Sequence, residues 1–213
     1  GTLKLPGAAC RLITDVRPSM PHDTPISLVT RWRDWRRRRF LRRHGIAPAP
    51  WRTALAGSPV LQPLDTAERE RLRELASRFL RLKTVSGAGG LEAGDDMRVF
   101  IAAQACLLIL DLDLDYFGGW YEVIVYPGSF LVDREETDAA GVIRNARHSL
   151  RGEAWGRGPV ILSWDDIRPG AAPYGRGTNV ILHEFAHKLD MLNGAANGLP
   201  PLHRGMSRPA WTA

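Results

Sequence analysis

The strongest hydrophobic pattern in the chain predicts a helix from Asp65 to Lys83. Its apolar residues recur at intervals of three and four positions: Leu72, Leu75, Phe79 and Leu82. This period matches the 3.6-residue turn of an α-helix, so one face of the helix is expected to be buried. Asp65 and Glu68 form an acidic variant of the capping box that marks a helix N-terminus.

A second helix is predicted over residues 97–110, which are rich in Ala and Leu and follow Asp95 and Asp96. The segment before it contains a cluster of glycines: Gly87, Gly89, Gly90 and Gly94. This cluster predicts a loop but not a phosphate-binding loop, because no strand is predicted before it and no Lys-Ser/Thr pair follows it. Prolines and a glycine predict an irregular connector over residues 48–63.

Short apolar runs between residues 121 and 164 predict strands. Residues 121–126 and 129–132 form two of them, separated by Pro127 and Gly128, and residues 159–164 form a third. The acidic stretch 133–158 predicts a hairpin or an exposed excursion, with an edge strand at 142–144. Asp165 and Asp166 are expected to begin a short helical turn.

A third helical pattern, over residues 179–192, contains the sequence His183-Glu184-Phe185-Ala186-His187. No Gly or Pro interrupts it, and Thr178 and Gly194 are expected to cap its ends. Two histidines four residues apart project from one helix face, so both imidazoles can bind one zinc ion. Glu184 can then take a proton from a water molecule beside the metal. The alternative is that both histidines are ordinary surface or core residues.

The sequence leaves the third ligand of such a site open. Glu184 is the last Glu in the chain, and Asp190 and Asn193 occupy the Gly and His positions of the HExxHxxGxxH pattern, which is thereby excluded. The remaining downstream candidates are Asp190 and His203. Asp190 is better suited to accept a hydrogen bond from a ligand imidazole, and His203 lies in a predicted loop. We expect that the chain stops before its third ligand and hydrolyses peptides weakly or not at all.

Length and composition indicate one globular core. A chain of 213 residues with 44% hydrophobic content can bury one core and a small appendage. No stretch approaches 18 apolar residues and the N-terminus has no signal-peptide pattern, so a cytoplasmic protein without a membrane span is expected. Cys10 and Cys106 match no metal-binding spacing, and Cys106 lies in an apolar run where a buried, reduced thiol is expected.

The basic charge of the chain is concentrated in one segment. Residues 31–43 contain eight Arg and one Asp, a net charge of +7, so the other residues together carry −1 of the chain's +6. The simplest interpretation is a solvated arm. Trp32, Trp35 and Phe40 also allow a helix that docks on RNA, an anionic membrane surface or a partner protein.

These patterns divide the chain into two predicted parts. Residues 1–58 form an N-terminal extension with the arginine-rich arm, partly disordered, and residues 59–213 form a domain whose C-terminal part is missing. The order of helix, helix, small sheet and helix predicts an α+β fold. In it a small mixed sheet packs beside the motif helix, as in zincin-like HExxH metallopeptidases.

Four segments resemble the Mlc titration factor A family of bacterial zinc peptidases. The first is the motif helix with its continuation Lys188-Leu189-Asp190, followed by Asn193-Gly194 and Gly198-Leu199-Pro200. The second and third are the strand segments 119–127 and 160–167, and the helical segment 71–80 is also similar. The resemblance covers residues 59 to 202.

The resemblance implies a cytoplasmic, zinc-dependent peptidase with aminopeptidase-like activity on small substrates. It also implies binding to a transcriptional repressor of sugar-uptake genes. Carried over to this sequence, His183 and His187 are zinc ligands and Glu184 is the general base, while the family's third ligand is a Glu in a later helix. Two alternatives stay open. The chain can be a catalytically impaired fragment or pseudo-peptidase that binds the repressor, or a protein that binds nucleic acid or a membrane surface through residues 31–43.

Overall fold

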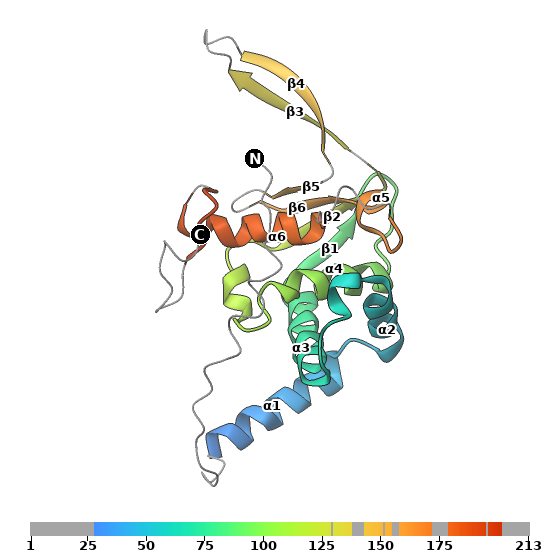
Figure 1. Ribbon diagram of the computed structural model, residues 1–213, viewed down its shortest axis with the longest axis vertical. Helices are drawn as coiled ribbons and strands as arrows, with labels where there is room; N and C mark the ends of the chain where they lie inside the picture. Colours follow the sequence, from blue (N-terminus) through green and yellow to red (C-terminus); the bar gives the residue numbers. More distant parts are fainter. Residues whose placement is uncertain are drawn as a thin grey trace.

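The computed structural model describes residues 28–128, 130–137, 143–150, 152–154, 158–171, 179–194 and 196–201 (Figure 1). The α-helices are α1 (Leu28–His44), α2 (Pro48–Gly57), α3 (Thr66–Leu82), α4 (Asp95–Leu107), α5 (Trp164–Ile167) and α6 (Val180–Asp190). Short 3-10 helices are η1 (Pro59–Leu61), η2 (Leu114–Phe117) and η3 (Met191–Asn193). The strands are β1 (Thr84–Gly87), β2 (Glu122–Tyr126), β3 (Phe130–Thr137), β4 (Ile143–Leu150), β5 (Gly152–Ala154) and β6 (Val160–Ser163). These helices and strands are compatible with the predicted α+β class.

The central sheet is mixed, as predicted, and has the strand order β1-β2-β6-β5. Strands β1, β2 and β6 run parallel, and β5 pairs antiparallel with β6 at the edge. Helix α4 lies between β1 and β2 in the chain, which makes β1-α4-β2 a βαβ unit. Helix α6 contacts β5, β6 and α4, so it lies alongside the sheet near its antiparallel edge (Figure 1).

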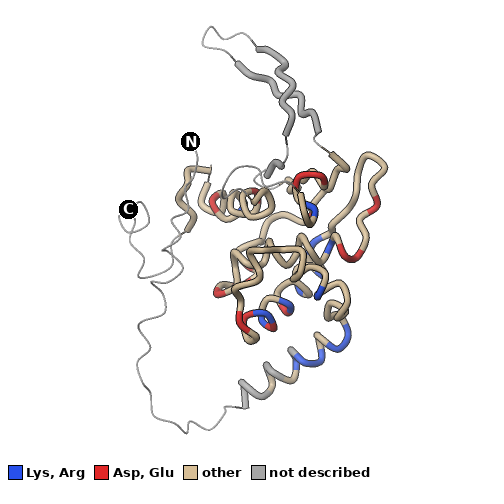
Figure 2. The backbone as a smooth tube through the Cα atoms, turned by 45° about the vertical axis from the view of Figure 1, so that its right-hand side comes forward, with Lys and Arg blue, Asp and Glu red and all other residues tan. Residues whose placement is uncertain are grey.

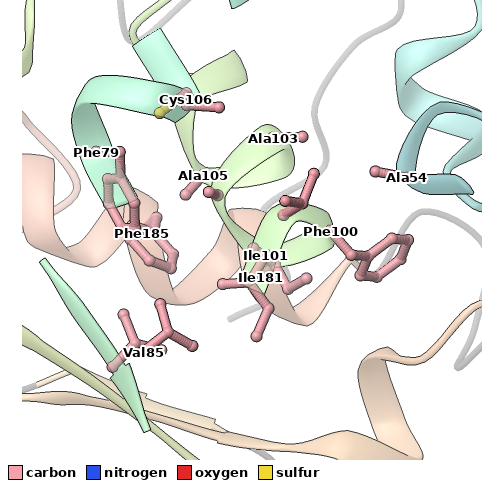
Figure 3. Close-up of a cluster of buried hydrophobic side chains, with 14 of the residues drawn as sticks. Ala54, Phe79, Val85, Phe100, Ile101, Ala103, Ala105, Cys106, Ile181 and Phe185 are labelled. Atoms are coloured by element: carbon pink, nitrogen blue, oxygen red, sulfur yellow. The ribbon is translucent and has the colours of Figure 1, made fainter. Parts of the chain in front are cut away.

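One hydrophobic core joins the sheet to α2, α3, α4 and α6 (Figure 3). Helix α4 is buried on most of its surface, as the Ala and Leu residues of segment 97–110 predict. Its Cys106 is fully buried and free, which confirms the expected reduced thiol. Burial raises the pKa of this thiol far above its ordinary value, so it stays protonated and chemically inert.

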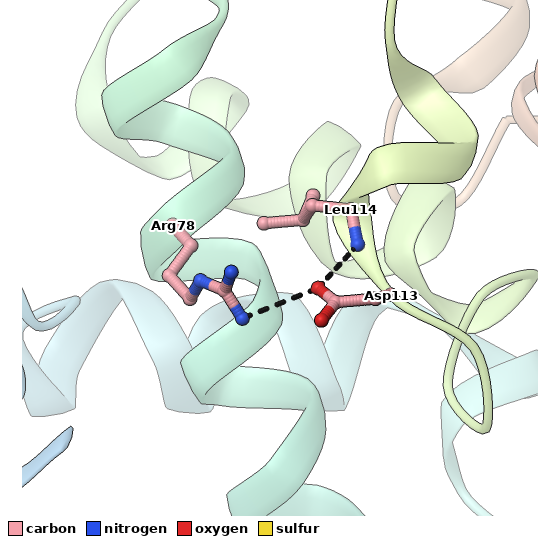
Figure 4. A network of polar contacts seen from close by, with 3 residues as sticks. All are labelled: Arg78, Asp113 and Leu114. Atoms are coloured by element: carbon pink, nitrogen blue, oxygen red, sulfur yellow. Dashed lines mark hydrogen bonds and ion pairs between the residues drawn. The ribbon is translucent and has the colours of Figure 1, made fainter. Parts of the chain in front are cut away.

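The predicted cap of α3 is present. The Asp65 carboxylate accepts a hydrogen bond from the Glu68 amide at 2.8 Å, and the Glu68 carboxylate accepts one from the Asp65 amide at 2.8 Å. The other end of α3 is tied to the turn before β2, because Arg78 pairs with Asp113 at 3.3 Å (Figure 4). Asp113 also accepts a hydrogen bond from the Leu114 amide and begins η2.

The predicted irregular connector over residues 48–63 is wrong. Its first part is α2, which begins at Pro48, and Pro59 begins η1. Proline fits both positions because the first turn of a helix needs no amide donor there. Trp51 and Ala54 of α2 are buried in the core. The buried core therefore extends N-terminal to residue 58, and the division of the chain at that residue stays a prediction.

No strand was expected before the glycine cluster, but strand β1 leads directly into it. It has four residues, too few for an alternating pattern to stand out from the end of α3. At the tip of the cluster, Gly89 and Gly90 have φ angles of 62° and 84°, which only glycine adopts readily. A Cβ at Gly87 would lie 1.9 Å from the Leu91 carbonyl oxygen, so this loop is closed upon itself.

The segment after β2 is a hairpin, one of the two expected forms. Strands β3 and β4 pair antiparallel over their whole length as a separate two-stranded sheet that projects from the body (Figure 1). The strand predicted at 129–132 is therefore longer than expected. The edge strand expected at 142–144 overlaps the start of β4, which pairs with β3 and not with the central sheet.

Helix α1 contacts the body only near its C-terminal end. The Ser77 hydroxyl of α3 accepts a hydrogen bond from the Ile46 amide at 3.1 Å, and Arg73 donates to the Ile46 carbonyl. The rest of α1 extends away from the other helices, and basic residues lie along it (Figures 1 and 2). The N-terminal extension, residues 1–58, is expected to be partly disordered, and its residues 1–27 lie outside the described residues. Among the described residues, no helix is both long enough and apolar enough to cross a membrane.

Candidate metal centre

Helix α6 carries the His-Glu-Phe-Ala-His sequence, and its first turn is fixed by Asn179. The Asn179 side-chain oxygen accepts a hydrogen bond from the Leu182 amide at 3.0 Å, which makes Asn179 the N-cap. The predicted cap, Thr178, lies one residue earlier and outside the described residues. The Asn179 amide group also donates to the Gln104 side-chain oxygen at 2.6 Å, which fastens the start of α6 to α4.

Aromatic packing fixes the rotation of α6 about its axis. Phe185 is fully buried and belongs to a cluster of four rings whose centroids lie 5.4 to 6.2 Å apart. The members of this aromatic cluster are Phe79, Phe117, Trp120 and Phe185, and each contacts the other three. Ile181, one turn before Phe185, is also buried. Residues on the opposite side of α6 are therefore held toward solvent.

His183 and His187 lie together on that outer side. Their Nε2 atoms are 3.1 Å apart, and their ring centroids are 4.5 Å apart with the rings nearly perpendicular. Two imidazoles on one tetrahedral zinc ion have nitrogens about 3.3 Å apart, given Zn–N bonds of about 2.0 Å. The two side chains thus fit a shared metal ion in spacing and in exposure.

The ionisation of His183 also fits a metal ligand. Partial burial, and secondarily the neighbouring His187, lower the pKa of His183 below its ordinary value. The neutral imidazole, which is the form that binds a metal, is therefore favoured at neutral pH.

Glu184 differs from the two histidines in its burial. Its side chain is 6% exposed, whereas His183 is exposed and His187 is partly exposed. Successive residues are about 100° apart around a helix, so Glu184 lies between the histidine side and the buried side of α6. A carboxylate in that position is shielded from bulk water and still adjacent to the imidazoles.

A third ligand is not found in the described part of the chain. No group of three His, Cys, Asp or Glu side chains there could hold a metal ion. Asp190 does not orient an imidazole as expected. Its Oδ2 accepts a hydrogen bond from the Gly198 amide at 2.8 Å, and its buried Oδ1 has no hydrogen-bond partner in the part of the chain that the structure describes. This carboxylate instead fixes the loop after η3. His203 lies outside the described residues.

The fold also brings together two lysines that the sequence did not single out. Lys83 is the C-cap of α3, and Lys188 follows His187 in α6. Both side chains are buried. The Nζ atom of Lys83 lies 4.1 Å from the centroid of the Trp120 ring, and that of Lys188 lies 5.0 Å from it. Lys83 donates to the carbonyls of Phe117 and Trp120, and Lys188 donates to the Gly158 carbonyl at 2.6 Å. Loss of hydration lowers the pKa of each amine to about 8.

One signal for these lysines is present in the sequence. The chain has 29 basic Lys and Arg residues, and only three of them are Lys. Arg keeps its charge in any surroundings, whereas a buried Lys can release its proton. Lysines at apolar positions in an arginine-rich chain therefore indicate buried amines. In this protein both of them pack against the Trp120 ring, next to the motif helix.

Comparisons with known proteins match the chain to a metallopeptidase family. A family model described as glucose-regulated metallo-peptidase M90 matches residues 32–213. The chain is 42% identical over 152 residues to Mlc titration factor A of Escherichia fergusonii, covering 71% of this chain and 56% of the relative. It is 40% identical over 156 residues to the protein of the same name from Cronobacter sakazakii, covering 73% of this chain and 58% of the relative. The chain thus spans less than two thirds of the length of these curated relatives.

Proposed function

The chain belongs to the glucose-regulated metallo-peptidase M90 family, and on that premise we propose that it is a zinc-dependent peptidase. His183 and His187 hold the metal ion, and Glu184 is the general base. The observation that carries this proposal is the 3.1 Å separation of the two Nε2 atoms on the exposed side of α6. Two neutral imidazoles suit zinc better than they suit calcium or magnesium, which prefer oxygen ligands.

A zinc ion at this position supplies Lewis-acid activation of water and of the peptide carbonyl. Glu184 accepts a proton from the attacking water and transfers it to the nitrogen of the leaving amine. The water oxygen forms the new bond to the carbonyl carbon as the carbon–nitrogen bond breaks. The low exposure of Glu184 supports its role as a base, because it keeps the carboxylate out of bulk water and beside the two imidazoles.

The substrate class that we propose rests on the resemblance of the sequence to its family and on the exposed position of the histidines. We propose aminopeptidase-like hydrolysis of small peptides, in the cytoplasm. The position of α6 beside the antiparallel edge strand β5 supports this and the proposed zincin-like arrangement, since an extended peptide can pair with the sheet at that edge. The third zinc ligand comes from outside the described residues.

A second candidate function is binding to a transcriptional repressor. The relatives carry the name Mlc titration factor A, which describes a protein that titrates Mlc. In this alternative the chain is a catalytically impaired fragment or pseudo-peptidase.

Hydrolysis of fluorogenic aminoacyl and dipeptide substrates distinguishes the two candidates. The zinc-supplied chain is expected to show weak hydrolysis that a chelator abolishes and that Glu184→Gln reduces by about 100-fold or more. The matched control is Glu122→Gln, which removes a partly buried carboxylate from β2. Zinc binding with no hydrolysis above the Glu184→Gln level would contradict the peptidase proposal and favour repressor binding. Hydrolysis that persists in Glu184→Gln would exclude the proposed base.

A further inference from the structure

Helix α1 presents a mixed surface of tryptophan and arginine that the metal site does not use. Trp32 and Trp35 are 55% and 52% exposed, although large aromatic side chains are usually buried. The Arg36 guanidinium lies over the Trp32 ring at 4.7 Å, and that of Arg39 lies over the Trp35 ring at 5.6 Å. Because these contacts join residues on neighbouring turns, aromatic faces and positive charges alternate along one side of the helix.

This surface continues onto the body of the protein. A shallow hollow on α1 is lined by Trp32, Trp35, Arg36, Arg39, Phe40, Arg43 and His44. His44 also lines a cleft of about 600 Å³ between the ends of α1 and α3 and the start of α4. Arg81 and Arg98 line the same cleft, and Asp95 is the one acidic side chain in its lining. A basic track therefore runs from the exposed tryptophans to the cleft, over about 18 Å of α1.

We propose that this track binds single-stranded nucleic acid. Unpaired bases stack on indole rings and on guanidinium planes, and the phosphates between them pair with arginine. Both kinds of contact need aromatic and cationic groups at alternating positions, as on α1. A duplex offers phosphates but few open base faces, so it would use the arginines and leave the tryptophans without a role.

The distribution of arginine on α1 argues against an anionic membrane as the partner. A helix that lies in a membrane surface separates an apolar side from a charged side. On α1 the exposed apolar rings lie beneath guanidinium groups, so burying the tryptophans in lipid would also bury Arg36 and Arg39. Phe40 and Leu41, which are less exposed, lie toward the end of α1 that contacts α3.

Fluorescence anisotropy with labelled 16-nucleotide oligouridine and oligothymidine tests the proposal on the whole chain. Binding to either strand is expected, with a logarithmic salt slope of about −3 to −4, which corresponds to about five phosphate contacts. Replacing Trp32 or Trp35 by Ala should weaken binding by about 5-fold or more for each residue. A 16-base-pair duplex should bind more weakly than the single strands.

Charge-matched variants separate stacking from simple attraction. The double variant Arg36→Gln, Arg39→Gln should weaken binding and reduce the magnitude of the salt slope by about 1.4. The control Arg52→Gln, Arg71→Gln removes the same charge from exposed positions on α2 and α3 and should change affinity by less than about 2-fold. Arg36→Lys, Arg39→Lys keeps the charge but loses the planar groups, and should also weaken binding.

Three results would overturn the proposal. The first is oligonucleotide affinity unchanged by Trp32→Ala and Trp35→Ala, and the second is duplex binding as tight as single-strand binding. The third is binding to vesicles of phosphatidylglycerol without binding to either oligonucleotide. The proposal is independent of the metal site, so Glu184→Gln should bind oligonucleotides as the unmodified chain does.

Discussion

Helices α6 and α1 both carry charged or titratable groups on their exposed sides, but the protein supports them in different ways. Five residues of α6 are buried, and its first turn is fastened to α4 through Asn179. Among the described side chains of α1, none is buried, and its contacts lie near its C-terminal end. The difference matches the chemistry proposed for each. Two metal ligands need a fixed separation, whereas a polyanion-binding surface needs charge and open ring faces.

Phe185 shows how the support of α6 is built. It lies between the two histidines in sequence and points to the opposite side of the helix, into the aromatic cluster. Holding this one ring therefore fixes the direction of both imidazoles. On α1 each tryptophan ring instead lies beneath an arginine of the next turn, Arg36 over Trp32 and Arg39 over Trp35.

The largest expected effect comes from removing that ring. Phe185→Ala should lower the free energy of unfolding by about 3 to 5 kcal/mol, because it leaves a cavity among three other rings. Urea denaturation followed by circular dichroism measures the change. Phe40→Ala on α1 is the matched control and should cost less than about 1 kcal/mol. Equal losses in the two variants would contradict the difference between the helices.

The next effect concerns the lysine that packs on the aromatic cluster. The pKa of Lys83 falls from 10.5 to about 8 in the folded protein. The folded state therefore holds this proton less tightly than the unfolded chain, and raising the pH from 8 toward 10.5 should stabilise the fold. We expect a gain of up to about 2 kcal/mol, since carbonyl and ring contacts offset part of the cost of burying the charge.

Lys83→Met should reduce this pH dependence, as measured by urea denaturation at pH 7.5, 9 and 10.5. Lys188 contributes a similar dependence, so the variant should keep part of it. Arg52→Met on α2 is an exposed control and should leave the dependence unchanged. A stability that falls between pH 8 and 10.5 in the unmodified chain, and not in Lys83→Met, would show that the charged amine is favoured in the folded state.

A smaller effect is expected at the start of α6. Asn179→Ala removes the N-cap and the bond to Gln104, and should lower the free energy of unfolding by about 1 kcal/mol. Asn197→Ala, which removes a local contact in the exposed loop after η3, should change it by less than about 0.5 kcal/mol. Thermal unfolding measures both. If the two variants are equally stable, Asn179 does not anchor the helix.

The smallest effect is expected on α1. Replacing Trp32 and Trp35 together by Ala should change the free energy of unfolding by less than about 0.5 kcal/mol, because both rings are exposed. Trp51→Ala on α2 removes a buried ring and should cost about 3 to 5 kcal/mol. Urea denaturation compares them. A large loss in the α1 variant would mean that the tryptophans support the fold.

The sequence predicted the elements whose patterns are long. Helix α3 with its Asp65 cap, helix α4 and the motif helix α6 are where the hydrophobic periods placed them. Helix α2 was not predicted because proline usually breaks a helix, although Pro48 occupies the first turn, where proline is tolerated. Strand β1 was missed because four residues carry too little pattern.

The candidate site was predictable only as far as one helix defines it. The separation of His183 and His187 follows from helix geometry, and the structure places their nitrogens 3.1 Å apart. Asp190 was expected to orient a ligand imidazole, which was wrong. Its carboxylate instead accepts a hydrogen bond from the Gly198 amide in the loop after η3. Contacts between distant segments, such as those of Lys83 and Lys188 with Trp120, depend on tertiary packing that no local pattern describes.

Metal content is the most direct test of the central claim that His183 and His187 hold a zinc ion. Zinc per chain is to be measured after saturation and desalting in the unmodified protein, His183→Ala, His187→Ala and Glu184→Gln. We expect about one zinc per chain in the unmodified protein and in Glu184→Gln, and none in either histidine variant. A zinc content that is zero in the unmodified chain, or that survives both histidine substitutions, would contradict the account.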